Sequence, residues 1–199
     1  MSSELLETRP RLLDVAWRLL EERRGRDVTM LEIANRAGVS RQTVYIHFRN
    51  RSDLLIATTH YADQILNVDE RLKKSRASTA GLDRLDAYVE FWGNYLPQIY
   101  GLAKALLLLR ETDDAAAAAW SDRMMAMKDG CRAAIEAIER DGMLAREWTS
   151  SEATDLLWIL LSPRNWELLY VDCSYSSAQY IARIQTLARR GFCSGDSCP

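Results

Sequence analysis

Residues Thr29 to Leu55 read T-M-L-E-I-A-N-R-A-G-V-S-R-Q-T-V-Y-I-H-F-R-N-R-S-D-L-L, and this stretch decides the fold. Gly38 can take the left-handed conformation that ends a helix, and Ser40 can cap the helix that follows. Upstream, Thr29 followed three residues later by Glu32 fits a capping box, so another helix is predicted to begin there. Two short helices joined by a glycine turn make a helix-turn-helix.

The second helix of this pair is predicted to present a polar face to the outside. Val44 and Phe48 are four residues apart and share the inner face. In a DNA major groove, Arg pairs with guanine, Gln with adenine, and the methyl groups of Thr or Ile with thymine, whereas Tyr, His and Arg also suit phosphate oxygens. The candidate DNA contacts are Thr29, Ser40, Arg41, Gln42, Thr43, Tyr45, His47 and Arg51. The alternative is an ordinary helical hairpin with a solvated polar face.

The stretch from Val28 to Leu55 resembles the DNA-binding signature of TetR-family transcriptional regulators. The similarity is carried by the pair Ile33-Ala34, the turn over residues 37–40, the aromatics Tyr45 and Phe48, and the helix start at residues 53–55. The resemblance implies a ligand-responsive homodimer, acting as a repressor, whose second helix reads the major groove of palindromic operator DNA. It also implies that a small-molecule effector releases the DNA.

Arg51 occupies a position where this family usually has a lysine bound to phosphate. An arginine keeps the positive charge and can contact a phosphate through two parallel hydrogen bonds. The resemblance therefore implies a phosphate contact for Arg51.

Composition favours one soluble globular chain of ordinary hydrophobicity. The 199 residues are 48% hydrophobic and 27% charged, with a net charge of −2. Residues 1–60 hold 10 Arg and 8 acids, giving +2, whereas the remaining 16 Lys and Arg and 20 acids give −4. This modest asymmetry agrees with a DNA-facing front and an acidic remainder, although a solvated face would also produce it.

The sequence predicts a cytoplasmic protein without metal, cofactor or membrane span. The N-terminus lacks a secretory pattern, and no segment reaches the ~18 apolar residues of a transmembrane helix. The four cysteines are scattered, and free thiols are expected in that compartment. Cys193 and Cys198 are close together, but their spacing is not that of a zinc site.

Helical periodicity continues along the rest of the chain and predicts an all-α protein of about nine helices. A long helix is expected to start near Asn50 and run to Leu72, followed by a loop, and Pro97 is expected to divide the next helix in two. Capping boxes begin at Thr149 and Ser176. The predicted domains are a helix-turn-helix domain over 1–51, a ligand-binding and dimerisation domain over 52–190, and a flexible tail over 191–199.

The second half is predicted to dimerise and to bind a ligand. The helices expected over 152–171 and 176–190 are apolar over wide arcs, and this region resembles the last two helices of TetR-family proteins, which form the homodimer interface. A buried core helix is the alternative. Family membership also implies an effector pocket, for which the candidate lining residues are Trp92, Tyr95, Trp120, Met124 and Trp158. Aromatic and Met side chains at helical spacing are also typical of plain core packing.

Two other functions compete with a DNA-binding regulator. An all-α enzyme would need a catalytic constellation, yet the chain has two His, no phosphate-binding loop and no cluster of metal ligands. An all-α adaptor that binds protein, without DNA binding or enzyme activity, would use the same apolar C-terminal surface. The effector, the operator, the regulated genes and the choice between repression and activation cannot be predicted from these residues.

Overall fold

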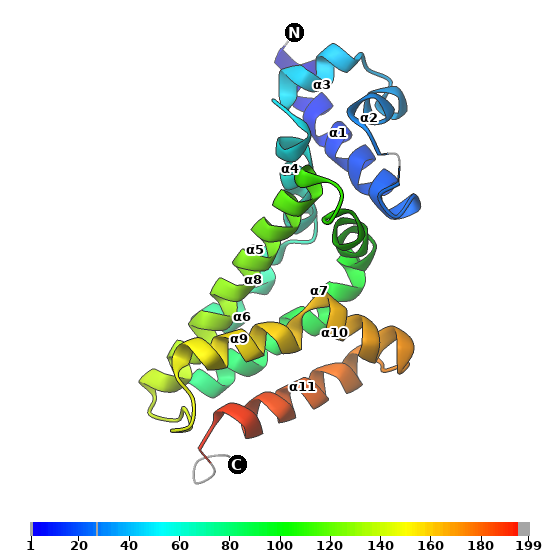
Figure 1. Cartoon of the computed structure of the whole chain (residues 1–199). Helices are drawn as coiled ribbons and strands as arrows, with labels where there is room; N and C mark the ends of the chain where they lie inside the picture. Colours follow the sequence, from blue (N-terminus) through cyan, green and yellow to red (C-terminus); the bar gives the residue numbers. More distant parts are fainter. Residues whose placement is uncertain (1, 27, 195–199) are drawn as a thin grey trace. The chain divides into compact units, whose positions relative to one another are not determined.

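The computed structural model describes residues 2–26 and 28–194. Within these residues the regular elements are helices joined by turns and short loops, together with an isolated backbone bridge between Leu144 and Cys193 (Figure 1). The elements are α1 (Ser2–Glu22), α2 (Met30–Ala37), α3 (Arg41–His47), α4 (Arg51–Ile65), α5 (Val68–Arg71), α6 (Lys73–Ala77), α7 (Gly81–Leu109), α8 (Asp114–Arg140), α9 (Ser150–Leu161), α10 (Pro163–Glu167), the π-helix η1 (Leu168–Asp172) and α11 (Ser177–Phe192). The predicted all-α class is confirmed.

Short elements account for the difference from about nine helices. The expected long helix after Asn50 ends at Ile65, where Asn67 takes a positive φ of 52°, and α5 and α6 follow in place of one continuous helix and a loop. Ser162 caps α10, and Pro163 occupies its first position, where a missing N–H costs nothing. Hence the penultimate helical region is divided into α9, α10 and η1.

The expected division at Pro97 was wrong, because α7 continues through this residue as one helix of 29 residues. A proline inside a helix removes one backbone hydrogen bond and costs about 3 kcal/mol. Tyr95 and Leu96, immediately before Pro97, are 2% and 0% exposed. Burial of such side chains offsets the lost bond, and this burial is a tertiary effect that the local sequence does not reveal.

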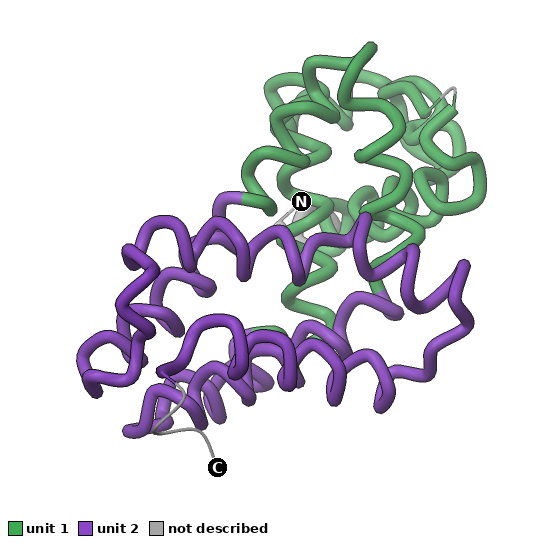
Figure 2. Tube along the Cα trace, turned by 60° about the horizontal axis from the view of Figure 1, so that its bottom comes forward, with its two compact units in different colours: residues 1–68, 99–124 green, residues 69–98, 125–199 purple. Residues whose placement is uncertain are grey.

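By packing, the chain divides into two compact units (Figure 2). Unit 1 contains residues 1–68 and 99–124, and unit 2 contains residues 69–98 and 125–199. The expected functional division into 1–51 and 52–190 follows a different criterion, so it stays a prediction.

Unit 1 is built around α1, which packs against α2 and α4. Its core joins residues from α1 through α4 with the end of α7 and the start of α8. Val44 and Phe48 are buried, as their helical spacing predicts. The other buried side chains of this core include Leu13, Ala16, Leu20, Ile33, Ala34 and Ala37. This core fixes the helix-turn-helix onto α1 and α4.

Unit 2 packs α9 against α10 and α11. Trp166 and Tyr180 are 1% and 0% exposed, and Tyr180 lies against Gly93 of α7. Arg189 of α11 forms an ion pair with Asp86 of α7. Of the three predicted capping boxes, those at Thr149 and Ser176 are present with both hydrogen bonds. At Thr29 the threonine caps α2, but the Glu32 carboxylate accepts a hydrogen bond from Arg23.

No helix in the described residues is both long enough and apolar enough to span a bilayer. Of the predicted flexible tail, Gly191 and Phe192 form the end of α11, and the backbone of Cys193 pairs with Leu144. Residues 195–199, including Cys198, lie outside the described residues.

Candidate nucleic-acid interface

The turn between α2 and α3 has the geometry that its sequence predicts. Gly38 has φ 67° and ψ 32°, the left-handed conformation, and its N–H donates to the carbonyl of Asn35 at 3.2 Å. Val39 N–H donates to the carbonyl of Ala34 at 3.0 Å. These bonds satisfy carbonyls at the end of α2, so the chain turns sharply into α3.

Side-chain oxygens cap both helices. Thr29 Oγ1 accepts from the N–H of Glu32 at 3.1 Å, while Glu32 Oε1 accepts from Arg23 at 2.7 Å. Ser40 Oγ accepts from the N–H of Thr43 at 3.0 Å and lies 2.9 Å from Thr43 Oγ1. The hydroxyls of Thr29 and Ser40 therefore hold the ends of the two helices in place.

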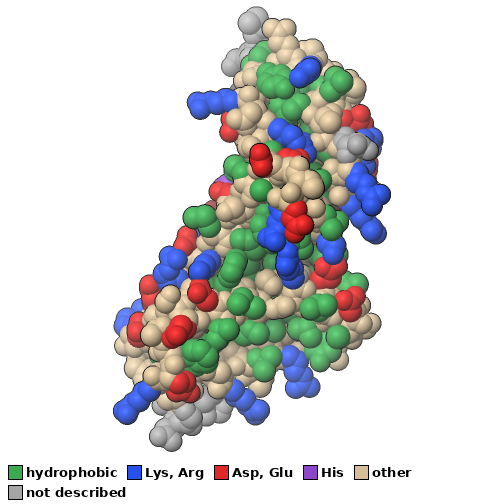
Figure 3. Space-filling view, viewed as in Figure 1, with side chains coloured by type: hydrophobic (Ala, Val, Ile, Leu, Met, Phe, Trp, Pro, Cys, Tyr) green, Lys and Arg blue, Asp and Glu red, His purple; other side chains and the backbone are tan. Residues whose placement is uncertain are grey.

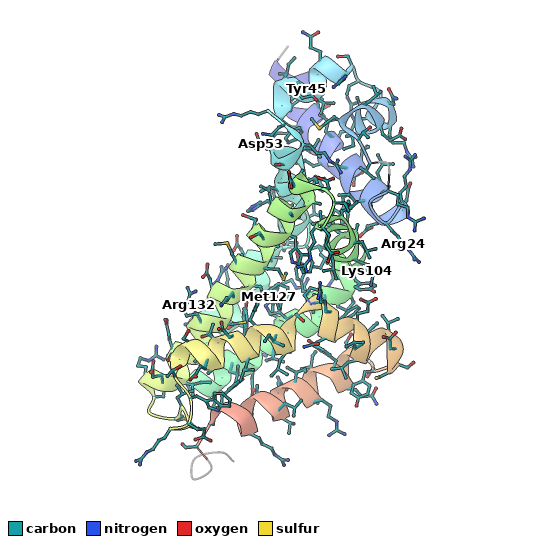
Figure 4. All side chains as sticks on the ribbon, in the orientation of Figure 1. Arg24, Tyr45, Asp53, Lys104, Met127 and Arg132 are labelled. Atoms are coloured by element: carbon teal, nitrogen blue, oxygen red, sulfur yellow. The ribbon has the colours of Figure 1, made fainter. Side chains whose placement is uncertain are left out.

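The outer face of α3 carries the side chains that suit base edges. Arg41 and Gln42 are exposed, and Ile46 is 65% exposed. Tyr45, labelled in Figure 4, is 43% exposed. The Arg41 guanidinium lies 5.5 Å from the centroid of the Tyr45 ring. Because Val44 is fully buried on the opposite side, the orientation of this face is fixed by the core of unit 1.

His47 is placed differently from the other candidates on α3. Its Nε2 atom is buried and has no hydrogen-bond partner among the described residues, and its ring lies 6.3 Å from that of Phe48. His47 also borders a groove of about 460 Å³ along α1 and α4. This groove was not predicted, because its walls come from segments far apart in the sequence; they include Arg9, Arg49, Asp53, His60 and Tyr61.

Arg51, the predicted phosphate contact, is bound to a carboxylate within unit 1. Its Nε and Nη2 donate to Asp113 Oδ2 at 3.0 and 2.8 Å. Asp113 stands directly before α8, 62 residues away in sequence. The sequence contains no signal that identifies Asp113 as the partner of Arg51, because Asp113 is one of many acidic residues in the chain.

The predicted effector-pocket residues are divided between the two units. In unit 2, Trp92 and Tyr95 meet edge to face at 5.6 Å, and the Lys128 ammonium lies 5.4 Å from the Trp158 ring centroid. In unit 1, Trp120 and Met124 of α8 are half-buried. The pocket itself therefore stays a prediction.

The cysteines and acids form no group of three potential metal ligands within residues 2–26 and 28–194. Cys131 and Cys193 are buried, and burial raises the pKa of the Cys131 thiol well above its ordinary value. The Cys131 thiol is therefore protonated at neutral pH and behaves as an apolar core group.

Comparison with known proteins identifies this helix-turn-helix. Residues 12–58 match the family described as bacterial regulatory proteins, tetR family. Over 51 residues, 26% of the chain, the sequence is 45% identical to the HTH-type transcriptional regulator AcrR of Shigella flexneri. Residues 12–58 are therefore a TetR-family DNA-binding domain. The matched stretch spans 24% of the length of AcrR, so the family assignment rests on the DNA-binding part.

Solved structures extend the likeness from residues 12–58 to the fold of nearly the whole chain. A transcriptional regulator from Saccharomonospora viridis in complex with choline has a TM-score of 0.74 at 18% identity, covering 94% of this chain and 98% of that one. NalD of Pseudomonas aeruginosa, the secondary repressor of the MexAB-OprM multidrug efflux pump, has a TM-score of 0.71 at 21% identity, covering 96% and 98%.

Proposed function

We propose that this TetR-family protein is a transcriptional repressor, which binds palindromic operator DNA as a homodimer and is released by a small-molecule effector. The observation that carries the proposal is the outer face of α3, where Arg41, Gln42, Tyr45 and Ile46 are exposed on a helix capped by Ser40. An α-helix fits the major groove, and a helix held by caps and a buried core presents its side chains in one orientation.

Each exposed side chain suits a particular partner on DNA. Arg41 can donate two hydrogen bonds to guanine, Gln42 can bind adenine with both amide atoms, and the Ile46 side chain suits a thymine methyl group. Tyr45, Thr29 and Ser40 suit phosphate oxygens. The fold shared with NalD favours repression over activation, because NalD is a repressor.

The homodimer is supported by exposed apolar side chains on the last helices of unit 2. Apolar groups gather over α9 to η1 on the face shown in Figure 3. The exposed residues are Leu156, Ile159, Leu168, Val171 and Leu187, at 37%, 48%, 54%, 49% and 55% of their surfaces. A group of apolar residues on neighbouring helices is typical of a protein interface, because leaving it in water costs about 25 cal/mol per Å².

The effector is proposed to contact the aromatic residues of the predicted pocket. In unit 2 the Arg71 guanidinium lies 5.5 Å from the ring centroids of both Phe91 and Tyr95. Aromatic faces attract cations. An apolar cation could therefore compete with Arg71 at this place, and the choline in the S. viridis structure is a ligand of that type.

A gel shift with duplex DNA from the region upstream of its own gene tests the proposal. We expect a dimer to bind this DNA more tightly than a scrambled duplex, with an affinity that falls as salt rises. Choline, titrated into the complex, tests one effector. A folded dimer that binds neither duplex, even at low salt, would overturn the proposal and favour the protein-binding adaptor, which would use the apolar surface of α9 to α11.

A further inference from the structure

The Arg51 side chain is engaged inside unit 1, although its position in the helix-turn-helix suits a DNA phosphate. The Nε and Nη2 groups form the edge of the guanidinium that binds an oxyanion, and both donate to Asp113. The remaining nitrogen, Nη1, is buried without a hydrogen-bond partner among the described residues. The two side chains are 24% and 22% exposed, so the pair is largely shielded from water.

Asp113 is itself held in place by the start of α8. Its Oδ1 accepts hydrogen bonds from the N–H groups of Ala115 and Ala116 at 2.9 and 3.2 Å. Burial alone would raise the pKa of this carboxyl, but the hydrogen bonds and charge of Arg51, together with those two amides, lower it. Asp113 is therefore a fixed anion, with one oxygen bound to α8 and the other to Arg51.

We propose that Asp113 takes the place of an operator phosphate at Arg51 in the DNA-free protein and must release Arg51 before this residue can bind the DNA backbone. The inference rests on the proposed DNA binding and adds a regulatory contact to it. A carboxylate and a phosphate present similar pairs of oxygens to the same guanidinium edge, so the two acceptors compete.

The competition makes DNA affinity depend on the first turn of α8. If this turn holds Asp113 against Arg51, each protomer binds DNA with one phosphate contact fewer. Trp120 and Met124, two candidates for effector contact, lie 7 and 11 residues after Asp113, about two and three turns along α8. An effector that contacts them would act on the helix that positions the competing carboxylate.

The test is a salt titration of binding to a random-sequence duplex, which needs no knowledge of the operator. Asp113→Asn keeps an oxygen that can cap α8 but removes the charge that holds Arg51. We expect it to bind more tightly than wild type, with a slope of log K against log salt that is steeper by about 0.9 per protomer, as one gained phosphate contact requires. Asp113→Ser, which also caps a helix, should behave in the same way.

Two matched variants separate this effect from a general change of charge. Asp114→Asn changes the charge equally at the adjacent exposed residue, so it sets the baseline. In an Arg51→Ala background, Asp113→Asn should give no gain beyond that baseline. Thermal melts identify any variant that has lost its fold.

The proposal is overturned if both folded Asp113 variants bind no more tightly than Asp114→Asn, or if their gain persists without Arg51. Weaker binding would overturn it too, since Asp113 would then position Arg51 for DNA. These results leave the proposed function intact, because wild type would still bind the duplex. If neither wild type nor the Asp113 variants bind DNA at low salt, the proposed function fails as well.

Discussion

The phenolic oxygen of Tyr88 donates a hydrogen bond to the backbone carbonyl of Met127 at 2.8 Å, and glycine at position 130 leaves the space that the phenol fills. A Cβ atom at Gly130 would lie 2.1 Å from the Tyr88 oxygen and 2.5 Å from its Cζ atom. Tyr88 is 5% exposed, and this burial raises its pKa well above the usual value, so the phenol stays neutral. This contact joins α7 and α8 within unit 2.

Gly130→Ala is therefore expected to destabilise the protein, although alanine is normally the better helix former. The buried ring of Tyr88 would have to move, and overpacking of this kind costs about 1 to 3 kcal/mol. The free energy of unfolding in urea measures the effect.

Gly191→Ala is the matched control, because Gly191 also lies inside a helix, α11, but a Cβ there would meet no described atom within 4 Å. This change is expected to stabilise the protein by up to about 1 kcal/mol. Equal stabilities for the two variants would contradict the close packing of Tyr88 on α8.

Because of Asp113, the free energy of unfolding should change with pH in the acid range. Folding lowers the pKa of the Asp113 carboxyl from its ordinary value of 3.8. The ionised carboxylate therefore contributes fully to the free energy of unfolding above pH 3.8, and this contribution is lost as the pH falls through the lower pKa of the folded protein. Removing the carboxylate also leaves Arg51 without its ionic partner, at a cost of about 1 to 3 kcal/mol near neutral pH. We expect Asp113→Asn to unfold at lower urea concentration than wild type at pH 7.

The difference between the two proteins should shrink as the pH is lowered from 3.8 and should vanish in stronger acid. Urea titrations across this range measure it, with Asp114→Asn as the control for loss of one exposed acid. A difference that stays constant from neutral to strongly acidic pH would show that the ionised carboxylate of Asp113 does not stabilise the fold.

Local signals explain why the helix-turn-helix could be predicted from sequence. The left-handed turn at Gly38 and the cap at Ser40 depend on neighbouring atoms, and both are present as expected. The core position of Val44 follows from helical spacing. Each of these features is decided within a few residues, so one sequence is enough to predict it.

Features that depend on distant segments could not be predicted in this way. The helix continues through Pro97 because of burial around it, and Arg51 has a partner 62 residues away. The groove beside His47 forms only where α1 meets residues 47–64. Periodicity identifies which residues are apolar on a helix, but it does not identify which other segment they meet.

The apolar residues of α9 give a test of the homodimer. Ile159 is 48% exposed, and Ile159→Glu would place a charge in the proposed interface. Burying an unpaired carboxylate is strongly unfavourable, so the variant is expected to shift towards monomer. Sedimentation velocity over a range of protein concentrations measures the change.

Ile65→Glu is the control for this test, because Ile65 is 52% exposed on α4, away from α9 to α11 in sequence. It should leave the oligomeric state of the wild type unchanged. The proposed interface would be wrong if Ile159→Glu remained as dimeric as Ile65→Glu, or if the wild type were already a monomer at micromolar concentration.

Gln42 gives the sharpest test of base reading, because it is exposed on α3 next to the capped first turn and its amide can bind adenine through two hydrogen bonds. The operator is first selected from a pool of random duplexes with the wild-type protein. Gln42→Ala should then weaken binding to this operator by about 1 to 3 kcal/mol and relax the preference at one base pair in each half-site. Binding to random duplex should hardly change, since an uncharged side chain contributes little to the salt-dependent backbone term. A variant that lost affinity equally for operator and random DNA would show that Gln42 supports α3 or contacts the backbone, and base reading would then have to come from Arg41 or Ile46.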